Sequence, residues 1–311
     1  MTARPRIVVA GVANLCTAAD VATTSPARAD HRGFTDRMVT GVSGVGANVA
    51  STLKRLGARV DLCTLVGDDD AGRAVRAGLE REGLLGPGCV RARATPLSVS
   101  LVGADGRQLS YSYLDCLTGA TFPTGVFLDL VRGADLAVLT TAGFARPLIH
   151  HAQRAGVPIA VDVHVIADVH RPEQRAWLHS ADILFCSHER LPCPPREWIR
   201  QVFDAYPGCA VAGVGRGPDG AMVGLRDGTL VGARTEPPRA PANTVGAGDT
   251  LFASFLYGWV CAGNPVRALH DAVLHACWSI GDLFPNGGRL SGEELRELAR
   301  AHPVRVDVGR W

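Results

Sequence analysis

A short stretch of the sequence joins a turn of small residues to a carboxylate. Gly246, Ala247 and Gly248 leave three successive backbone N–H groups with almost no side chain over them, and Asp249 follows directly. From Asp249 to Trp259 the apolar residues recur at helical spacing. Unpaired N–H groups at the positive end of a helix dipole bind anions. The stretch can therefore hold a phosphoryl group while Asp249 takes a proton from an incoming hydroxyl.

A plain core helix is the other interpretation of the same residues. Asn243 and Thr244 can cap such a helix. A carboxylate in the first turn, as at Asp249, is favoured by roughly 0.3–1 kcal/mol through the helix dipole, so we expect it to be ionised. The motif by itself leaves both interpretations open.

A second stretch, residues 41–57, begins with glycines and continues as a helix. Leu53 and Leu56 share one helical face, and Gly57 can end the helix. Small residues at a helix start let a ligand approach closely. Asn48 can then bind a ligand or satisfy its own helix start, and the residues alone do not decide between these roles.

The elements that must position these stretches alternate between strand and helix, which is typical of a parallel sheet. The expected strands are 6–12, 58–66, 135–139, 158–163, 182–186 and 209–214. The expected helices are 71–82, 146–154, 173–179, 195–206, 249–259, 265–283 and 291–301. Hairpins are expected at 97–113 and 220–234, and residues 17–40 form either a loop or two short exposed strands.

The carboxyl ends of parallel strands form one rim, where ligands of such sheets bind. The rim positions are Thr140, Thr141, His164, Ser187 and residues 215–217. Three neighbouring carboxylates at residues 68–70 either bind a metal or cap the helix that follows, and capping is the interpretation we favour. No repeat or linker interrupts the chain, so we expect a single domain over residues 1–311.

Two motifs, TVGAGDTLFASF around Asp249 and SGVGAN ending at Asn48, resemble the signatures of the ribokinase-like (PfkB) carbohydrate kinase family. The resemblance spans nearly the whole chain. It implies an α/β, three-layer ribokinase-like fold, with a mostly parallel central sheet flanked by helices and a small β-lid near 17–40 and 97–115. It also implies a homodimer through the lid.

The resemblance assigns roles around the two motifs. Asp249 corresponds to the catalytic base, and the amides of Gly246, Ala247 and Gly248 correspond to the anion hole for the transferred phosphate. On the substrate side, Gly44 lets the sugar approach and Asn48 hydrogen-bonds its hydroxyls. The nucleotide-binding residues that the resemblance implies are Ser187, Gly215, Gly217, Gly220 and Asn286.

Several positions depart from the family pattern. Cys16 stands where the family usually has an Asp that binds two sugar hydroxyls, although Asn14 on the same face could substitute in part. Asn243 replaces an Asp that helps to hold a monovalent cation, which leaves such a cation doubtful. The family's Asp-Pro-Asn ends here in His164, and its Asn-x-x-Glu, which helps to order magnesium, ends in Arg190.

Composition restricts the chemistry further. Lys54 is the only lysine and lies in a helical pattern, and no GxxxxGK[ST] occurs, so neither a P-loop nor a protein-kinase site fits. The formal net charge of +2 gives no reason to expect nucleic acid. The nine cysteines form no CxxC pair, and the sequence shows no secretory signal or membrane span. We therefore expect a cytoplasmic protein.

These observations together predict an ATP-dependent phosphotransferase. It uses Mg²⁺ with ATP and phosphorylates a hydroxymethyl group of a sugar or sugar-containing small molecule, although the sequence assigns no protein ligand to the metal. A nucleoside kinase of the same family is an alternative, suggested by Cys16. A non-catalytic sugar- or nucleotide-binding protein on the same fold is another. An NAD-binding oxidoreductase fits less well because no GxGxxG follows the first strand.

Overall fold

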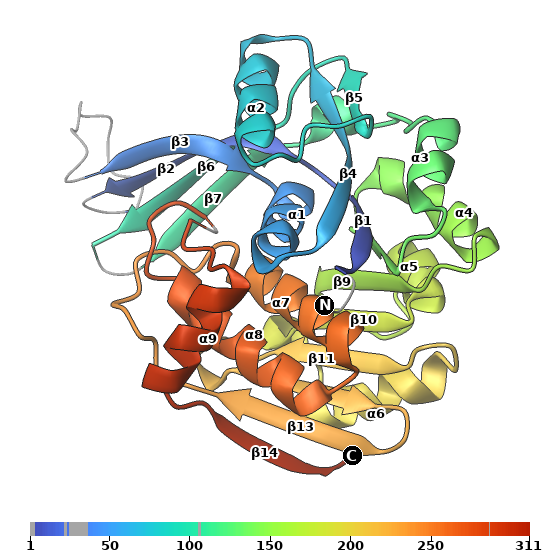
Figure 1. Cartoon of the computed structure of the whole chain (residues 1–311), viewed down its shortest axis with the longest axis vertical. Coiled ribbons are helices and arrows are strands. Elements are labelled where there is room, and N and C mark those ends of the chain that lie inside the picture. The colour runs from blue at the N-terminus through green and yellow to red at the C-terminus, as the bar shows by residue number, and fades with distance from the viewer. Residues whose placement is uncertain (1–3, 22–23, 25–36, 105–106, 286) are drawn as a thin grey trace.

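The computed structural model describes residues 4–21, 24, 37–104, 107–285 and 287–311 (Figure 1). Its centre is a large sheet in which the strands from β11 to β5 run parallel and β12, β13 and β14 are antiparallel. In spatial order the strands are β14 (Arg305–Arg310), β13 (Thr229–Arg234), β12 (Ala221–Leu225), β11 (Val211–Gly215), β10 (Ile183–Ser187), β9 (Ile159–Val165), β8 (Leu136–Leu139), β1 (Arg6–Ala10), β4 (Arg59–Gly67) and β5 (Cys89–Ala92).

Helices cover both faces of this sheet. One face packs against α3 (Thr124–Val131), α4 (Leu148–Arg154), α5 (Arg175–Ser180) and α6 (Pro195–Ala205). The other packs against α1 (Val45–Leu56), α2 (Asp70–Arg81), α7 (Ala247–Ala262) and α8 (Pro265–Ser279), and α9 (Gly292–Ala301) lies on α8. Single 3₁₀ turns occupy Asp115–Leu117, Gly143–Ala145, Pro172–Gln174, His188–Arg190 and Gly217–Asp219.

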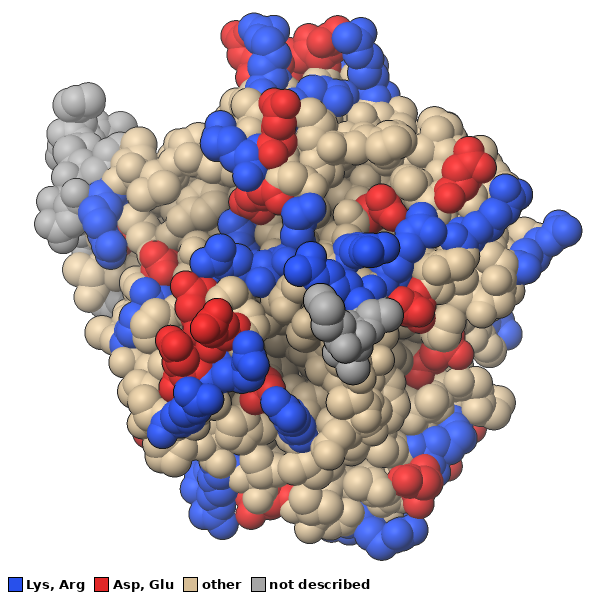
Figure 2. Space-filling view, in the orientation of Figure 1, with Lys and Arg blue, Asp and Glu red and all other residues tan. Residues whose placement is uncertain are grey.

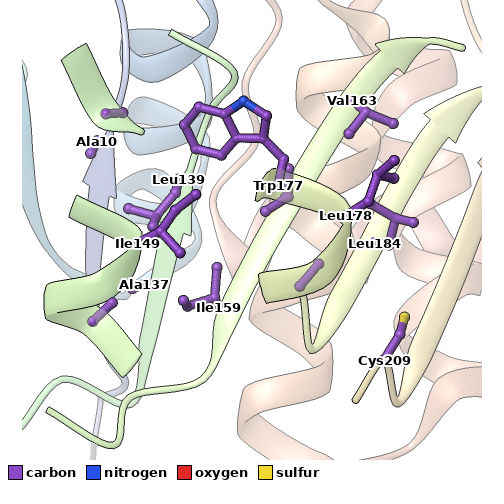
Figure 3. Close-up of a cluster of buried hydrophobic side chains, with 14 of the residues drawn as sticks. Ala10, Ala137, Leu139, Ile149, Ile159, Val163, Trp177, Leu178, Leu184 and Cys209 are labelled. Atoms are coloured by element: carbon purple, nitrogen blue, oxygen red, sulfur yellow. The ribbon is translucent and has the colours of Figure 1, made fainter. Parts of the chain in front are cut away.

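The strand sequences explain why the fold has three layers. In β1 the side chains of Val8 and Ala10 enter the core under α3–α6, whereas Ile7 and Val9 enter the core under α1, α2, α7 and α8. Because both faces are buried, the central strands read as continuous apolar runs. Figure 3 shows part of the core between the sheet and helices α3–α6. Its labelled side chains are Ala10, Ala137, Leu139, Ile149, Ile159, Val163, Trp177, Leu178, Leu184 and Cys209.

A separate four-stranded sheet lies beside α1 and α2 (Figure 1). Its order is β3 (Met38–Ser43), β2 (Asn14–Val21), β6 (Leu97–Gly103) and β7 (Gln108–Tyr113). We call it the small sheet. It contains the hairpin expected at 97–113. Of the described residues in 17–40, 17–21 belong to strand β2 and 38–40 to strand β3, so the strand alternative holds for them. Residues 22–23 and 25–36 lie outside the described part.

The expected α/β fold class is confirmed, and some elements differ from the sequence-based expectation. Residues 41–43 belong to strand β3 and not to the start of α1, and α7 begins at Ala247, before Asp249. Neither α3, β5 nor β14 was expected. Helix α3 is only eight residues long, β5 only four, and most of β14 is exposed and charged, so none of them shows a strong periodic pattern.

The carboxylates at residues 68–70 begin a helix, as we favoured. Asp69 is the N-cap of α2 and accepts hydrogen bonds from the amide of Gly72 at 2.7 Å and the hydroxyl of Thr95 at 2.6 Å. These bonds lower the pKa of Asp69, with the Thr95 hydroxyl as the largest cause. Among the described residues, no group of His, Cys, Asp and Glu side chains is placed to hold a metal ion.

The surface carries charges of both signs. Figure 2 shows Asp and Glu side chains interspersed among Lys and Arg on one face. The single lysine, Lys54, donates to the carbonyl of Gly83 at 2.6 Å and so ties α1 to the end of α2. Within the described part of the chain, every helix is too short or too polar to cross a bilayer.

Candidate active site

The turn before α7 reverses the chain through a left-handed glycine. Gly246 has φ 86° and stands at the N-cap position without a side-chain capping bond. The capping role expected for Asn243 is therefore wrong. Its carboxamide oxygen instead accepts from the amide of Val245 at 2.9 Å, and its nitrogen donates to the carbonyl of Leu283 at 2.7 Å.

The structure places the three amides at the start of α7, where the sequence predicts an anion hole, and one of them is already hydrogen-bonded. The amide of Ala247 donates to the carbonyl of Thr244 at 3.2 Å and is not free. The amides of Gly246 and Gly248 have no protein acceptor among the residues that the structure describes. A Cβ built on Gly248 meets no heavy atom within 4 Å, so open space lies beside it.

Asp249 lies in the first turn of α7 and is only 8% exposed. The side-chain amide of Asn48, from the first part of α1, donates to its carboxylate at 2.8 Å. Ser43 in turn donates to the Asn48 oxygen at 3.4 Å. Two motifs that are 201 residues apart in the sequence thus meet in one buried hydrogen bond.

The closeness of α1 to the sheet depends on glycine. A Cβ on Gly46 would lie 2.4 Å from the carbonyl carbon of Gly11, the residue that follows β1. Such an approach is available only to a residue without a side chain. The contact between Gly46 and Gly11 therefore determines how closely α1, and with it Asn48, packs against the end of β1.

Burial changes the acid–base behaviour of Asp249. Desolvation raises its pKa to about 6, while the hydrogen bond from Asn48 and the charge of His164 act in the opposite direction and Asp162 adds to the rise. The dipole of α7 alone would favour an ordinary low pKa. Burial outweighs the dipole here, although the carboxylate is still mostly ionised at pH 7. A base with a pKa slightly below neutral is well matched to proton transfer.

The expected acceptor-binding residues lie together near this carboxylate. Gly44 has φ 98°, and a Cβ on it would meet the side-chain oxygen of Asn14 at 3.0 Å. The nitrogen of Asn14 donates to the hydroxyl of Ser98 in the small sheet at 2.6 Å. Its oxygen is buried and has no hydrogen-bond partner among the described residues, so it can accept a bond from a ligand hydroxyl.

Cys16 occupies the same face of β2 but has different chemistry from a carboxylate. It is 2% exposed, and burial raises the pKa of its thiol. A neutral thiol is a weak donor and a weak acceptor, unlike an ionised Asp. Asp20, further along β2, pairs with Arg37 at 3.4 Å. The acceptor side therefore offers amide groups and a thiol, and the carboxylate that the resemblance implies is missing.

A cavity of about 480 Å³ opens at the α7 N-terminus. We call it the rim cavity. Ala247 and Gly248 of α7 line it, together with the carboxyl ends of β9, β10 and β11. The expected nucleotide residues Ser187, Gly215, Gly217 and Gly220 all line this cavity. Leu251, Val273, Ala276 and Cys277 give it an apolar wall.

Some residues in the rim cavity were missed or misplaced by sequence reasoning. Arg190 is exposed and is not among the lining residues, whereas Glu189 and His188 line the cavity. Glu189 lies one residue before Arg190, the position that matches the family's Glu. Allowing an offset of one residue in the Asn-x-x-Glu motif would have identified it. Thr140 lies against Gly11, and Asn286 is outside the described residues.

The geometry brings together, in an α/β fold, a buried carboxylate at a helix N-terminus, backbone amides with no protein acceptor in the described part of the chain, and a cavity of about 480 Å³. Residues 6–283 match the pfkB family carbohydrate kinase profile. The chain belongs to this family and is a carbohydrate kinase.

Curated relatives agree with this assignment. An ATP-dependent ribose-1-phosphate kinase from Halopiger xanaduensis is 31% identical over 245 residues, which cover 76% of this chain and 79% of that protein. An acarbose 7(IV)-phosphotransferase from an Actinoplanes species is 27% identical over 225 residues, which cover 71% of this chain and 74% of that protein.

Solved structures share the fold at low sequence identity. The microbiome-derived acarbose kinase Mak1 superposes with a TM-score of 0.83 at 21% identity, covering 96% of this chain and 100% of that chain. A structure described as a putative ribokinase from Agrobacterium tumefaciens gives 0.81 at 20% identity, covering 96% and 98%. The expected three-layer ribokinase-like fold is confirmed.

Proposed function

We propose that this carbohydrate kinase transfers the γ-phosphoryl group of Mg-ATP to a hydroxymethyl group of a sugar or sugar-containing small molecule. One observation carries the proposal. The buried Asp249 carboxylate is held by Asn48 of α1 at 2.8 Å, and the two residues just before it in α7, Ala247 and Gly248, line the rim cavity. A base between acceptor and phosphate is what an in-line transfer requires.

The chemical step uses few protein groups. Asp249 accepts the proton of the acceptor hydroxyl as its oxygen forms a bond to the γ-phosphorus. The bond from that phosphorus to the β–γ bridging oxygen breaks, and ADP leaves with the electron pair. The amides of Gly246 and Gly248 donate to the phosphoryl oxygens as negative charge develops on them. Asn48 and the unpartnered oxygen of Asn14 hold acceptor hydroxyls.

The residues of the rim cavity fit a magnesium–nucleotide complex. Mg²⁺ is commonly held by one or two carboxylates together with phosphate oxygens and water. Glu189 supplies a carboxylate at the edge of the cavity, with the Ser187 hydroxyl two residues before it. When bound, Mg²⁺ neutralises charge on the phosphates.

The acceptor class follows from the face of β2. Without a carboxylate at Cys16, the site gains little from a free vicinal diol at that position, and the side chains paired with this face of β2 are the small hydroxyls of Ser98 and Ser100. We propose a substituted acceptor, such as a sugar 1-phosphate or a glycoside, whose binding depends less on that diol than the binding of a free sugar does. The relatives named as ribose-1-phosphate kinase and acarbose 7(IV)-phosphotransferase act on acceptors of these kinds by name. A nucleoside is the second candidate, because it too is substituted at the anomeric carbon.

An acceptor panel tests this proposal. ADP release from Mg-ATP is measured with free pentoses and hexoses, sugar 1-phosphates, nucleosides and acarbose, with mass spectrometry of the product. We expect substituted acceptors to give a kcat/KM above that of free ribose or fructose. Equal or better use of free sugars would contradict the acceptor class. Binding of ligands without turnover would favour the non-catalytic alternative.

The residues around Asn243 do not fit a monovalent cation. Its nitrogen donates to the carbonyl of Leu283 at 2.7 Å and to the hydroxyl of Ser100 at 3.4 Å, so N–H groups already satisfy oxygens that a cation would need. Nearby, Arg239 donates to the carbonyl of Trp278 at 2.6 Å and pairs with Asp282 at 2.9 Å. We propose that fixed donors hold this loop in place of an ion.

Replacing K⁺ with choline in the assay should therefore leave kcat and KM of the wild-type enzyme unchanged. Asn243→Asp should create dependence on K⁺, because it removes the donor to Leu283 and adds a negative charge beside that carbonyl. Turnover of both proteins is measured in KCl and choline chloride at equal ionic strength. Stimulation of the wild type by K⁺ would contradict the proposal.

We propose one domain with the small sheet as its lid, and a homodimer through the outer face of that sheet. Leu97, Val99 and Tyr111 expose apolar surface on this face at 42%, 40% and 62%. All nine cysteines are free thiols, which suits a reducing compartment such as the cytoplasm.

A further inference from the structure

His164, the last residue but one of β9, is half-buried and has an unusual backbone conformation. Its φ is 56°, and it is the one non-glycine residue with positive φ in the part of the chain that the structure describes. The left-handed region costs most residues about 1–2 kcal/mol relative to glycine, although His, Asn and Asp enter it more readily than others. A conformation of this kind persists where the surroundings enforce it, and it concentrates at functional sites.

A β-bulge produces this conformation. The pairing of β9 with β10 places Asp162 opposite Phe185 and Val165 opposite Ser187, so β9 has one residue more than β10 across this step. The amide of His164 donates to the Asp162 carboxylate at 2.8 Å, which closes the bulge locally. Bulges re-aim a side chain next to active sites. Here the re-aimed side chain is the imidazole of His164, which lines the rim cavity.

The rim cavity is short of positive charge. Among the described residues that line it, none is Lys or Arg, and its Asp, Glu and His side chains are Asp162, His164, His188 and Glu189. His188 is already engaged, since its Nδ1 lies 3.1 Å from the carbonyl of Gly215. A nucleotide triphosphate in this cavity needs donors beyond the amides of α7. His164 can supply one, because it lines the same cavity as Ala247 and Gly248.

We propose that His164 is a second catalytic residue of this kinase, whose imidazole N–H donates to the phosphoryl group in transfer. This rests on the proposed function. The residue lies at the rim, within electrostatic reach of Asp249, since its charge lowers the pKa of that carboxyl. His164 therefore has two effects that one substitution can reveal. It stabilises charge on the phosphate, and it keeps the base ionised to lower pH.

The substitution His164→Asn separates this role from a structural one. Asn enters the left-handed conformation readily and can keep the backbone bond to Asp162, but its shorter side chain removes the imidazole. We expect an unchanged melting temperature and a kcat lowered by about 10²-fold, as for loss of one transition-state donor. The KM for the acceptor should change little, because the contact is with the phosphate.

The pH profile gives a readout that a structural role would not move. The groups that face Asp249 are Asn48 from α1 and Asp162 and His164 from β9, while His188 and Glu189 line the same cavity. His164 is the one charged group among these that lowers the pKa of Asp249, so its removal raises the pKa of that carboxyl. The acid limb of kcat should therefore shift to higher pH in His164→Asn.

Two further variants make the outcomes distinguishable. His150→Asn, on an exposed position of α4, should keep both kcat and the acid limb. Asp249→Asn should lose turnover. If Asp249→Asn remains active, the proposed function fails. If Asp249→Asn is inactive while His164→Asn keeps its kcat and its acid limb, only the role of His164 fails.

Discussion

Asp249→Asn should lower kcat by about 10²–10⁴ with little effect on nucleotide affinity, because it removes the proton acceptor and leaves the amides of Gly246 and Gly248 in place. The side-chain amide of Asn48 can still donate to the new oxygen, so the packing of α1 on α7 is retained. Steady-state kinetics and nucleotide titration on the same preparation measure both parts. An unchanged kcat would contradict the role of Asp249.

The same substitution should stabilise the protein at neutral pH. The carboxyl has a pKa of about 6 in the folded chain and about 3.9 when unfolded. Because the pKa of Asp249 is higher in the folded chain, the free energy of unfolding falls as pH rises from about 4 to 6. Above pH 6 the loss is complete and stays constant. Removing it should raise the free energy of unfolding by about 1–3 kcal/mol at pH 7 and by little at pH 4.

This pKa also predicts the acid limb of wild-type activity. As pH falls through about 6, Asp249 takes up a proton and can no longer accept one from the acceptor hydroxyl. The profile of kcat between pH 5 and 8 measures it. A limb near the ordinary carboxyl pKa of about 4 would mean that the group is more solvated than this structure shows.

Gly46→Ala should be the most damaging small substitution near the site. The added Cβ would lie 2.4 Å from the Gly11 carbonyl carbon and 2.7 Å from its Cα, and both are backbone atoms that cannot move without shifting β1 or α1. We expect a loss of about 2–4 kcal/mol in the free energy of unfolding. Thermal and denaturant unfolding measure it. Activity should fall as well, because Asn48 lies two residues further along α1.

Gly125→Ala is the matched control. Gly125 lies in helix α3, and a Cβ there meets no heavy atom within 4 Å. The change should stabilise by about 0.5–1 kcal/mol through helix propensity. If the two Ala variants were equally stable, the contact between Gly46 and Gly11 would not limit the position of α1.

Local patterns in the sequence predicted most of the fold and part of the site. The apolar runs of the central strands, the left-handed Gly57 that ends α1 and the capping box of Ser291 with Glu294 all follow from short-range chemistry, and the structure has each of them. The turn before Asp249 could be predicted for the same reason. Its small residues and the apolar helix after it stand side by side in the sequence.

Features that depend on long-range contacts could not be predicted. The bond between Asn48 and Asp249 joins residues on different helices, and the raised pKa of Asp249 follows from burial that no local pattern encodes. The bulge that turns His164 into the rim cavity arises from the pairing of β9 with β10. The Asn243 side chain bonds to Leu283, which the sequence places 40 residues away, instead of capping α7.

The most direct measurement follows the γ-phosphate itself. Labelled Mg-ATP is mixed with the wild-type chain and a substituted sugar acceptor, and the label is followed into the acceptor and into inorganic phosphate, with Asp249→Asn alongside. The account predicts that label appears on the acceptor's hydroxymethyl oxygen, in step with ADP and only with the wild type. Label found only in inorganic phosphate, or equal transfer by Asp249→Asn, would contradict it.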